Sequence, residues 1–498
     1  MEQLEVERKF DIAPDAPPPS LDGVVGVGQT RTHRMRAVYL DTVDLLLIRH
    51  RITLRRREGG ADEGWHLKLP RGSARLELHA PLGKSPGRMR VPERHRQAVA
   101  EALPDGLPEG AAGTLVPAAV LRTVRQETDL LDERGRVVAQ LCDDHVSALP
   151  EGRRWREVEV ELVEGGPGDE ALLDRIATAL LAQGLAASPS PSKLARALGD
   201  RPRRAEAGAG PTPDDSAGEV VRAYLLEQVS VILGREAGLR VDAPDAVHKS
   251  RVAARRLRSA LRTFRRLLDR EVTDPVREEL RWWGEVLGAP RDVEVLRARV
   301  GERVRSLPSD LVRGPVVGRV EGELAGRHAR GHAVLVEELD GERYLALTDA
   351  LVDLVAEPPW RGRARRSARA VLPGLVEKAA ERAAKEHGRA GLAEGADRLH
   401  LLHETRKRAK AARYGWEAIA PVFGGSATEH AEAWEQVTET LGAMQDASVA
   451  AARLRELVED AEEAGEPTLT YAVLLGRELE AQERAALDGE RAMDDALL

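Results

Sequence analysis

Residues 1–10 read MEQLEVERKF, and every second side chain from position 5 to position 9 is charged. Successive side chains of a β-strand point to opposite faces, so this run predicts a strand with Glu5, Glu7 and Lys9 on one face and Phe10 on the other. The ionic face could be exposed to water, or it could line a binding site. One strand alone leaves both interpretations open, so the rest of the chain must decide between them.

The composition narrows the classes of protein that are possible. A chain of 498 residues predicts two or three domains, and its net charge of −8 means that any polyanion site must be a local concentration of Arg and Lys. Cys142 is the only cysteine, so no intrachain disulfide is expected and a reducing compartment is favoured. No run approaches about 20 apolar residues, and the acidic N-terminus does not resemble a signal peptide. We therefore expect a cytoplasmic protein with no membrane span.

The pattern of the sequence changes near residue 200. Short alternating runs typical of β-strands fill residues 1–200, with two helical patches between them. Residues 201–216 are rich in Pro, Gly, Ala and charge, which indicates a linker. Helical periodicity then dominates residues 217–495. We expect an α+β multidomain protein, with an antiparallel β-barrel and flanking helices followed by an all-α domain.

Several later strands repeat the division into an apolar and an ionic face. The ionic sides carry Arg55 and Arg57; His66 and Lys68; and Glu157, Glu159 and Glu161. The charges are sorted by strand, whereas a face exposed to water usually mixes signs because adjacent like charges destabilise a sheet. If the apolar faces pack outward against the helices, the ionic faces line a tunnel. Clustered carboxylates need a cation and clustered Arg and Lys need an anion, so the set predicts a metal–polyphosphate site.

The N-terminal run resembles the ExExK signature of CYTH domains, the triphosphate tunnel metalloenzymes. The other motifs of that family follow in order: YLDT (39–42), LRRR (54–57), LKLP (67–70), LCDDHV (141–146), EVEVEL (157–162) and Ser192-Lys193. The resemblance covers about residues 1–200. It implies an antiparallel β-barrel tunnel that acts on triphosphates with Mg²⁺ or Mn²⁺.

The same resemblance assigns roles to individual residues. It implies metal binding by Glu5, Glu7, Glu157 and Glu159, with Glu161 and Asp143 as additions and Asp144 as the alternative to Asp143. It implies triphosphate binding by Lys9, Arg55, Arg57, Lys68, Arg125 and Lys193. The catalytic set is Glu5, Glu7, Lys9, Glu157 and Glu159. One position departs from the family: His66 stands where many members carry Thr, and it could donate to phosphate if it were protonated.

The helical region contains an approximate duplication. Residues 248–264 read HKSRVAARRLRSALRTF and are followed by LGAPRD, and residues 403–417 read HETRKRAKAARYGWE and are followed by LGAMQD. Each copy predicts a helix with a basic stripe opposite an apolar one, and no acidic partner is evident within either stripe. A solvated basic face is the alternative, but two matched stripes in a net acidic protein favour a phosphate backbone as the ligand.

The paired motifs closely resemble the CHAD domain, a helical module associated with inorganic polyphosphate. The resemblance covers about residues 217–495 and implies two pseudo-symmetric antiparallel bundles around a basic groove. The polyphosphate-binding residues expected from it are His248, Arg251, Arg255, Arg256, Arg258, Arg262, His403, Arg406, Lys407, Lys410, Arg413 and Tyr414. We assign no metal to the two motif histidines, because no Cys or carboxylate cluster accompanies them in the sequence.

The leading interpretation is a metal-dependent inorganic triphosphatase joined to a module that binds long-chain polyphosphate. The alternatives are a polyphosphate binder that associates with polyphosphate granules and has little catalysis, a thiamine triphosphatase, and a CYTH-type adenylate cyclase. The low aromatic content of 3% disfavours nucleic-acid bases as a ligand, although RNA is also a polyanion.

Overall fold

The computed structural model describes residues 2–4, 7–60, 62–71, 74–82, 90–149, 153–163, 168–206 and 210–497. Two compact units are present, and each is described by itself. The strand unit comprises Met1–Ala209 and Leu351–Pro358, and the helical unit comprises Gly210–Ala350 and Pro359–Leu498. Among the described residues, no helix has the length and apolar character needed to span a membrane.

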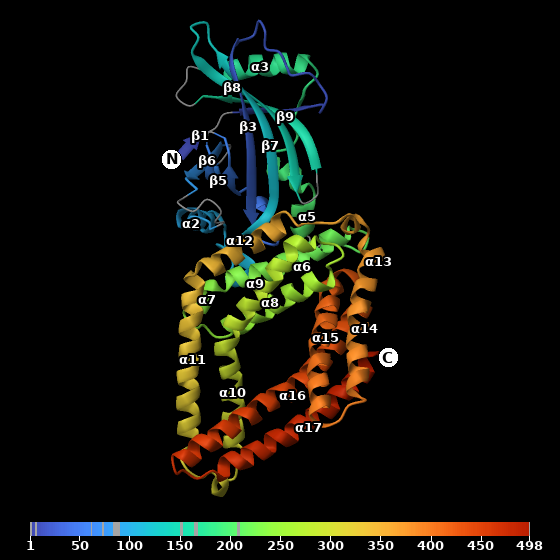
Figure 1. Cartoon of the computed structure of the whole chain (residues 1–498). Coiled ribbons are helices and arrows are strands. Elements are labelled where there is room, and N and C mark those ends of the chain that lie inside the picture. Colours follow the sequence, from blue (N-terminus) through green and yellow to red (C-terminus); the bar gives the residue numbers. More distant parts are fainter. Residues whose placement is uncertain are drawn as a thin grey trace. The chain divides into compact units, whose positions relative to one another are not determined.

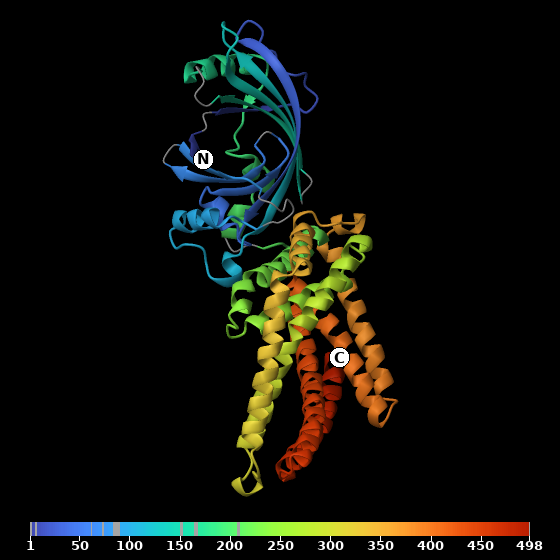
Figure 2. The same ribbon diagram turned by 60° about the vertical axis from the view of Figure 1, so that its left-hand side comes forward.

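The strand unit is built on one ten-stranded antiparallel sheet with the order β1-β6-β5-β4-β3-β7-β8-β9-β2-β10. The strands are β1 (Glu2–Leu4), β2 (Glu7–Ile12), β3 (Gly26–Asp41), β4 (Thr53–Glu58), β5 (Gly64–Arg71), β6 (Ala74–Ala80), β7 (Val116–Leu131), β8 (Val137–Leu149), β9 (Arg153–Leu162) and β10 (Ala186–Ala187). β1 and β2 follow each other in the chain but pair near opposite ends of the sheet, so the sheet must curve back toward itself, as Figure 2 shows. In the described residues this hydrogen-bonded ladder is not closed, so the expected barrel is an open one.

The two faces of the sheet differ as the alternation predicts. Outward-facing Val158 and Val160 pack against α3 (Glu170–Ala182), and outward-facing Leu54 and Leu67 pack in a cluster with Val99 of α2 (Glu93–Ala102). The ionic side chains therefore point into the space that the sheet encloses. This arrangement confirms the predicted fold class for the N-terminal region.

An apolar plug fills one part of that interior. Leu194 and Leu198 of α4 (Lys193–Leu198) pack with Tyr39 and Trp155, whose side chains also point inward. Ser192 caps this short helix by accepting a hydrogen bond from the Ala195 amide at 3.1 Å. The plug places Lys193, the first residue of α4, at the edge of the ionic interior.

The helical unit contains two copies of a similar helix order (Figure 1). The first copy has α6 (Ala217–Gly234), α8 (Ala246–Thr263), α9 (Arg270–Val286), α10 (Gly288–Arg305) and α11 (Val316–Asp340), and the second has α14 (Pro373–Ala390), α15 (Gly395–Phe423), α16 (Gly425–Glu463) and α17 (Leu469–Leu497). In each copy the helix that carries the basic motif packs on the helix before it and on the helix after it. The first copy breaks at Leu287, whereas α16 continues without a break. The predicted helical fold with an internal repeat is confirmed.

The segment that we interpreted as a linker has structure on both sides of its undescribed residues 207–209. Residues Arg201–Glu206 form α5. Beyond the gap, the carbonyl oxygens of Pro213 and Asp215 accept hydrogen bonds from the amides of Arg369 and Ala368 at 2.9 and 2.8 Å. Residues 210–216 are therefore part of the helical unit. Composition alone could not show this, because the residues that they contact, Ala368 and Arg369 of α13 (Ala368–Val371), lie about 150 positions away.

Candidate functional site

The strand unit encloses a cavity of about 630 Å³ that is lined by charged side chains from most of its strands. Its charged lining residues are Glu7, Lys9, Arg55, Arg57, Asp62, Lys68, Glu77, Arg125, Glu127, Asp144, Glu159, Glu161 and Lys193. Glu5 lies outside the described residues, so its predicted role stays a prediction. The structure thus brings together nearly all of the side chains that the sequence places in the tunnel.

Three carboxylates gather where β8 and β9 meet. Asp144 lies opposite Glu157 in the strand register, and one carboxylate oxygen of each of Asp144, Glu157 and Glu159 lies within 4.8 Å of the others. All three side chains are buried. Buried like charges at this spacing require a cation among them, and hard oxygen donors suit Mg²⁺ or Mn²⁺. Glu157 lies behind the lining residues and accepts a hydrogen bond from Trp155 Nε1 at 2.6 Å.

The Lys193 ammonium is the cation that the structure places in this cluster. Its Nζ lies 3.0 Å from Asp144, 2.7 Å from Glu157 and 2.6 Å from Glu159. Burial lowers the pKa of Lys193, but these carboxylates outweigh it and hold the pKa well above its usual value. A divalent ion bound to the same oxygens would displace this ammonium, which would then be available to phosphate.

Asp143 does not belong to the cavity. It lies on the other face of β8, where Arg156 donates to both of its oxygens at 2.8 and 2.6 Å. Adjacent residues of a strand point in opposite directions, so only one of the two aspartates can face the interior. The structure therefore corrects the placement of Asp143 and puts its alternative, Asp144, beside the other acids.

Two further cations contact the acidic cluster. Lys9 lies 3.1 Å from Glu7 and 2.9 Å from Glu159, because Lys9 and Glu159 are opposite each other in the register of β2 and β9. Arg125 donates to both oxygens of Asp144 and, at 2.8 Å, to Glu159. Burial raises the pKa of Glu159, but Lys193, Lys9 and Arg125 outweigh it and hold that pKa well below its usual value. Burial also raises the pKa of Asp144, but Lys193 and Arg125 outweigh it and lower that pKa, so Asp144 and Glu159 both carry a negative charge at neutral pH.

The basic wall comes from β4 and β5. Arg55 donates to the Tyr39 hydroxyl at 3.2 Å, Arg57 forms an ion pair with Asp62, and Lys68 lies 3.3 Å from Glu77. Burial, followed by Arg55 and Arg125, lowers the pKa of Arg57 to about 9. Such a crowd of cations in a buried wall is stabilised by an anion between them.

His66 has a structural role in the basic wall formed by β4 and β5. Its Nδ1 lies 2.8 Å from Glu77 and its Nε2 lies 2.8 Å from the Asp62 carbonyl oxygen. Both ring nitrogens therefore have protein partners, and the idea that His66 donates to phosphate is not supported by this geometry. Sequence reasoning missed Asp62 because it lies in the turn between β4 and β5, outside any alternating run.

In the helical unit, four predicted residues from α8 and α15 converge. Arg251 and Arg255 of α8 lie near Arg406 and Lys410 of α15. The positive charges of the three arginines repel the Lys410 ammonium. Burial, followed by Arg406, Arg255 and Arg251, lowers the pKa of Lys410 to about 6. We call these four residues the cationic cluster. Asp292 lies 2.6 Å from Arg251, and Asp446 acts on Arg406, so two acids face four bases.

The LGxxxD motifs explain how two of these arginines are held. In both copies the aspartate of the motif faces the arginine of HxxR: Asp292 with Arg251, and Asp446 with Arg406. The glycine of the motif leaves room for the same guanidinium. A Cβ on Gly288 would lie 3.5 Å from Arg251 Nη2, and a Cβ on Gly442 would lie 3.1 Å from Arg406 Nη2.

Three other predicted residues lie in an ion-pair network instead. Arg256 and Arg413 both contact Glu417, at 2.8 and 2.7 Å, and both guanidinium groups lie 5.8 Å from the ring of Tyr414, which is buried. Arg413 also contacts Glu435 of α16. The expectation of stripes without acidic partners is therefore wrong for this part of the second repeat. These residues fix α15 against its neighbours.

The remaining predicted residues lie on the borders of the cluster. His248 is exposed at the start of α8, and the nearby charges that lower its pKa, after burial, are those of Arg291 and Arg255. Arg258 and Arg262 are exposed farther along α8, beside arginines of α9, α14 and α15. His403 lies near Arg406 and Lys407, and Lys407 is exposed and contacts Glu404 at 2.6 Å. These side chains extend the basic surface beyond the cationic cluster.

Comparison with known proteins identifies the family. The CYTH domain matches residues 3–198, and the CHAD domain matches residues 223–455. The uncharacterized protein Rv2226 of Mycobacterium tuberculosis is 36% identical over 512 residues, which cover 98% of this chain and 96% of the relative. The chain belongs to the CYTH–CHAD family. CYTH domains are metal-dependent, and their family includes triphosphatases and adenylate cyclases.

Solved structures are similar to each half of this CYTH–CHAD protein. PptA from Streptomyces chartreusis is 23% identical and covers 56% of this chain and 99% of its own, with a TM-score of 0.46. The CHAD domain from the plant Ricinus communis is 24% identical and covers 57% and 93%, with a TM-score of 0.45. The putative adenylyl cyclase HpAC1 from Hippeastrum is 20% identical and covers 41% and 96%, with a TM-score of 0.26.

Proposed function

We propose that the CYTH unit hydrolyses inorganic tripolyphosphate with Mg²⁺ or Mn²⁺, and that the CHAD unit binds long-chain polyphosphate. The observation that carries the first half is a single cavity with a cluster of three carboxylates on β8 and β9 and a row of cations on β4 and β5. A cavity with carboxylates on one side and cations on the other suits a polyphosphate that binds together with a metal ion, because the carboxylates can hold the metal and the cations can hold the phosphates.

The residues of the cavity fall into a set that fits a metal ion and a set that would hold phosphate. Asp144, Glu157 and Glu159 fit a divalent ion, which would neutralise phosphoryl oxygens and activate a water. Arg55, Arg57 and Lys68 would hold the chain and stabilise the charge that spreads over the phosphoryl group in the transition state. Lys9 contacts Glu7 and Glu159 and lines the cavity with them, so it can reach an oxygen of the terminal phosphate.

The lining favours an inorganic substrate. Among the described lining residues, Tyr39 supplies the one phenol ring, and the histidines His33, His66 and His79 are the other rings. The Tyr39 hydroxyl accepts a hydrogen bond from Arg55, and both nitrogens of His66 are engaged. The described lining also includes Met35, Leu121 and Leu162, so the preference for an inorganic substrate rests on the charged side chains that line most of the cavity.

Phosphate release from tripolyphosphate, ATP, thiamine triphosphate and long polyphosphate, each with Mg²⁺, Mn²⁺ or EDTA, tests this half. Metal-dependent release that is fastest with tripolyphosphate and that falls at least tenfold in Glu159→Gln is expected. Fastest release from thiamine triphosphate or from ATP would replace the substrate. No release with any metal would leave the protein as a binder.

The cationic cluster supports the second half. Four bases and two acids leave a local excess of positive charge in a protein whose net charge is −8, and burial, followed by the three arginines, lowers the pKa of Lys410 to about 6. A polyphosphate chain would relieve this repulsion, because its oxygens bind arginine in a bidentate way. Each contact to an ionised partner contributes about 1.5–3 kcal/mol.

Titration of the full-length protein with long polyphosphate at two salt concentrations tests this half. Arg255→Ala with Arg406→Ala should weaken binding more than tenfold and reduce its salt dependence. Arg484→Ala with Arg491→Ala is the matched control, because these α17 arginines are exposed and pair with acids one turn earlier. Equal effects of the two double variants would contradict the proposal, and tighter binding of RNA than of polyphosphate would change the ligand.

A further inference from the structure

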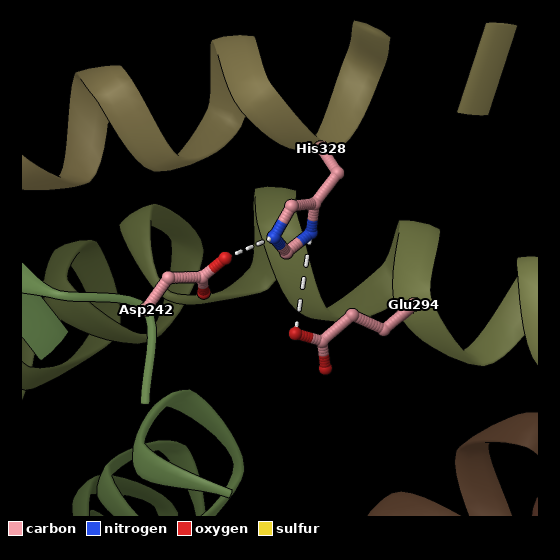
Figure 3. Close-up of side chains that lie close together, drawn as sticks. All are labelled: Asp242, Glu294 and His328. Atoms are coloured by element: carbon pink, nitrogen blue, oxygen red, sulfur yellow. Dashed lines mark hydrogen bonds and ion pairs between the residues drawn. The ribbon is translucent and has the colours of Figure 1, made fainter. Parts of the chain in front are cut away.

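A second group of metal-ligating side chains lies in the helical unit, in a place that the polyphosphate proposal does not use. Asp242 lies in the turn between α7 (Glu236–Arg240) and α8, Glu294 lies on α10, and His328 lies on α11 (Figure 3). The three residues are 52 and 34 positions apart in sequence, so only the folded chain brings them together. One ligand atom of each lies within 4.8 Å of the others.

The histidine ring stands between the two carboxylates. His328 Nε2 lies 2.8 Å from Asp242 Oδ2, and His328 Nδ1 lies 4.0 Å from Glu294 Oε1. Ligands that share one zinc ion lie about 2.0–2.2 Å from it, so their atoms are roughly 3 Å apart. The spacing of Nε2 and Asp242 is close to this value, and Glu294 can approach by a change in its own side-chain torsions.

The surroundings of His328 leave Nε2 as the ligand atom. Nδ1 faces the Pro290 carbonyl oxygen at 3.4 Å. A metal-bound histidine usually donates its other ring N–H to a backbone carbonyl or a carboxylate, which fixes the tautomer and aims the free lone pair at the ion. Here the Pro290 carbonyl oxygen lies on the Nδ1 side and Asp242 lies on the Nε2 side, so Glu294, which is 4.0 Å from Nδ1, is the ligand that has to turn toward an ion at Nε2.

Asp242 and Glu294 each turn one carboxylate oxygen toward the histidine. Arg291 contacts Oε2 of Glu294 at 2.8 Å, so Oε1 is the oxygen turned toward His328. Asp242 has a left-handed backbone with φ of 51°, which presents its carboxylate from the turn. His332 follows one turn later on α11, and its ring is nearly parallel to that of His328 at a centroid distance of 6.4 Å. Two histidines at this spacing share one face of a helix.

We propose that Asp242, Glu294 and His328 bind a divalent transition-metal ion that ties the α7–α8 turn, α10 and α11 together. One imidazole nitrogen and two carboxylate oxygens form a mixed donor set that suits Zn²⁺ better than Mg²⁺, and water would fill the remaining positions. The site differs from the acidic cluster of the strand unit, whose donors are all oxygen.

Equilibrium dialysis of the full-length protein against Zn²⁺, followed by metal analysis, tests the proposal. Wild type should retain one equivalent more than Asp242→Asn and His328→Ala. Asparagine tolerates a left-handed φ as aspartate does, so Asp242→Asn should fold even if His328→Ala does not. His387→Ala is the matched control, because His387 lies on α14 and contacts a single carboxylate, Asp494, at 3.2 Å.

A second readout follows stability. Zn²⁺ should raise the Tm of wild type and of His387→Ala by several degrees more than that of Asp242→Asn, since an ion that binds only the folded state stabilises it. Equal zinc contents and equal shifts in Tm in wild type, Asp242→Asn and the control would overturn the site.

Discussion

The pair Asp143 and Asp144 offers the sharpest test of the CYTH cavity, because two adjacent carboxylates have opposite surroundings. Asp144 is fully buried and contacts Arg125 and Lys193 inside the cavity. Asp143 is 3% exposed and forms a bidentate pair with Arg156 on the outer face. The substitutions Asp144→Asn and Asp143→Asn remove the same charge from the same strand, so any difference between them comes from the direction of the side chain.

The structure gives the expected size of each effect. In Asp144→Asn, Arg125 keeps Glu159 and Lys193 keeps Glu157, so no buried cation is left alone and the loss of stability is modest. Substitutions even beyond the direct ligands of a metal cost about 10–100-fold in affinity, so this variant should raise the metal concentration for half-maximal activity by at least that factor, or roughly 1.4–2.7 kcal/mol. In Asp143→Asn the Arg156 charge stays buried without its partner, which lowers the free energy of unfolding by about 3–5 kcal/mol.

Two measurements separate the variants. Tripolyphosphate hydrolysis at increasing Mn²⁺ gives the metal midpoint, and urea unfolding gives the stability. Asp143→Asn should keep the wild-type midpoint wherever it is folded, and Asp143→Leu with Arg156→Met should recover stability because both charges are then gone. A raised metal midpoint in Asp143→Asn together with an unchanged one in Asp144→Asn would refute the assignment of faces on β8.

Three further outcomes follow from single contacts. Lys193→Gln should bind Mn²⁺ at a lower concentration than wild type in a metal titration but hydrolyse tripolyphosphate more slowly, because the ammonium competes for the carboxylates and later holds phosphate; an unchanged metal midpoint would contradict this role. Lys410, whose pKa is lowered to about 6 by burial and then by nearby arginines, should take up a proton when polyphosphate binds. Affinity should therefore rise as the pH falls from 8 to 6 and level off below 6, and Lys410→Met should show no such rise. Without ligand, Lys410 opposes folding fully below pH 6 and less as the pH rises toward 10.5, so urea unfolding of wild type and Lys410→Met should converge at high pH. Gly442→Ala should displace Arg406 and weaken polyphosphate binding while the helix gains up to about 1 kcal/mol, whereas Gly476→Ala, with open space around it, should gain stability alone.

Period-two alternation was enough to predict the strand unit and most of its lining. Glu159, Arg55 and Lys68 each follow an outward apolar neighbour and Glu157 precedes one, so their direction could be read from the sequence. The aspartates of β8 could not be assigned in this way. Their strand has apolar residues on both faces, since Leu141 packs outward in the α3 cluster and Val146 packs inward in the plug. The alternation within LCDDHV therefore could not predict which aspartate faces the cavity until the structure gave the strand register.

The helical unit shows a different limit. Helical periodicity predicted α8 and α15 and the direction of their basic stripes. It could not predict all of the basic residues that are neutralised. Glu417 lies on α15 itself, but Glu435 lies on α16, and Asp292 and Asp446 lie about 40 residues after the arginines that they face. Pairing of helices depends on packing, which a single helix does not encode. For the same reason the sequence did not predict that Asp242, Glu294 and His328 lie together, because they come from three different elements.

The two proposed phosphate sites differ in their balance of positive and negative side chains. In the cavity, Lys193, Lys9 and Arg125 already pair with the acids, so a metal must displace Lys193 before those carboxylates can hold it beside a phosphate chain on the basic wall. In the cationic cluster, the bases outnumber the acids, and the anion alone supplies the missing charge. Polyphosphate binding by the CHAD unit should therefore persist in EDTA, whereas hydrolysis in the CYTH unit should stop. On this proposal, removal of metal should leave phosphate chains bound but not hydrolysed, and a loss of both activities in EDTA would show that the cluster also needs a metal.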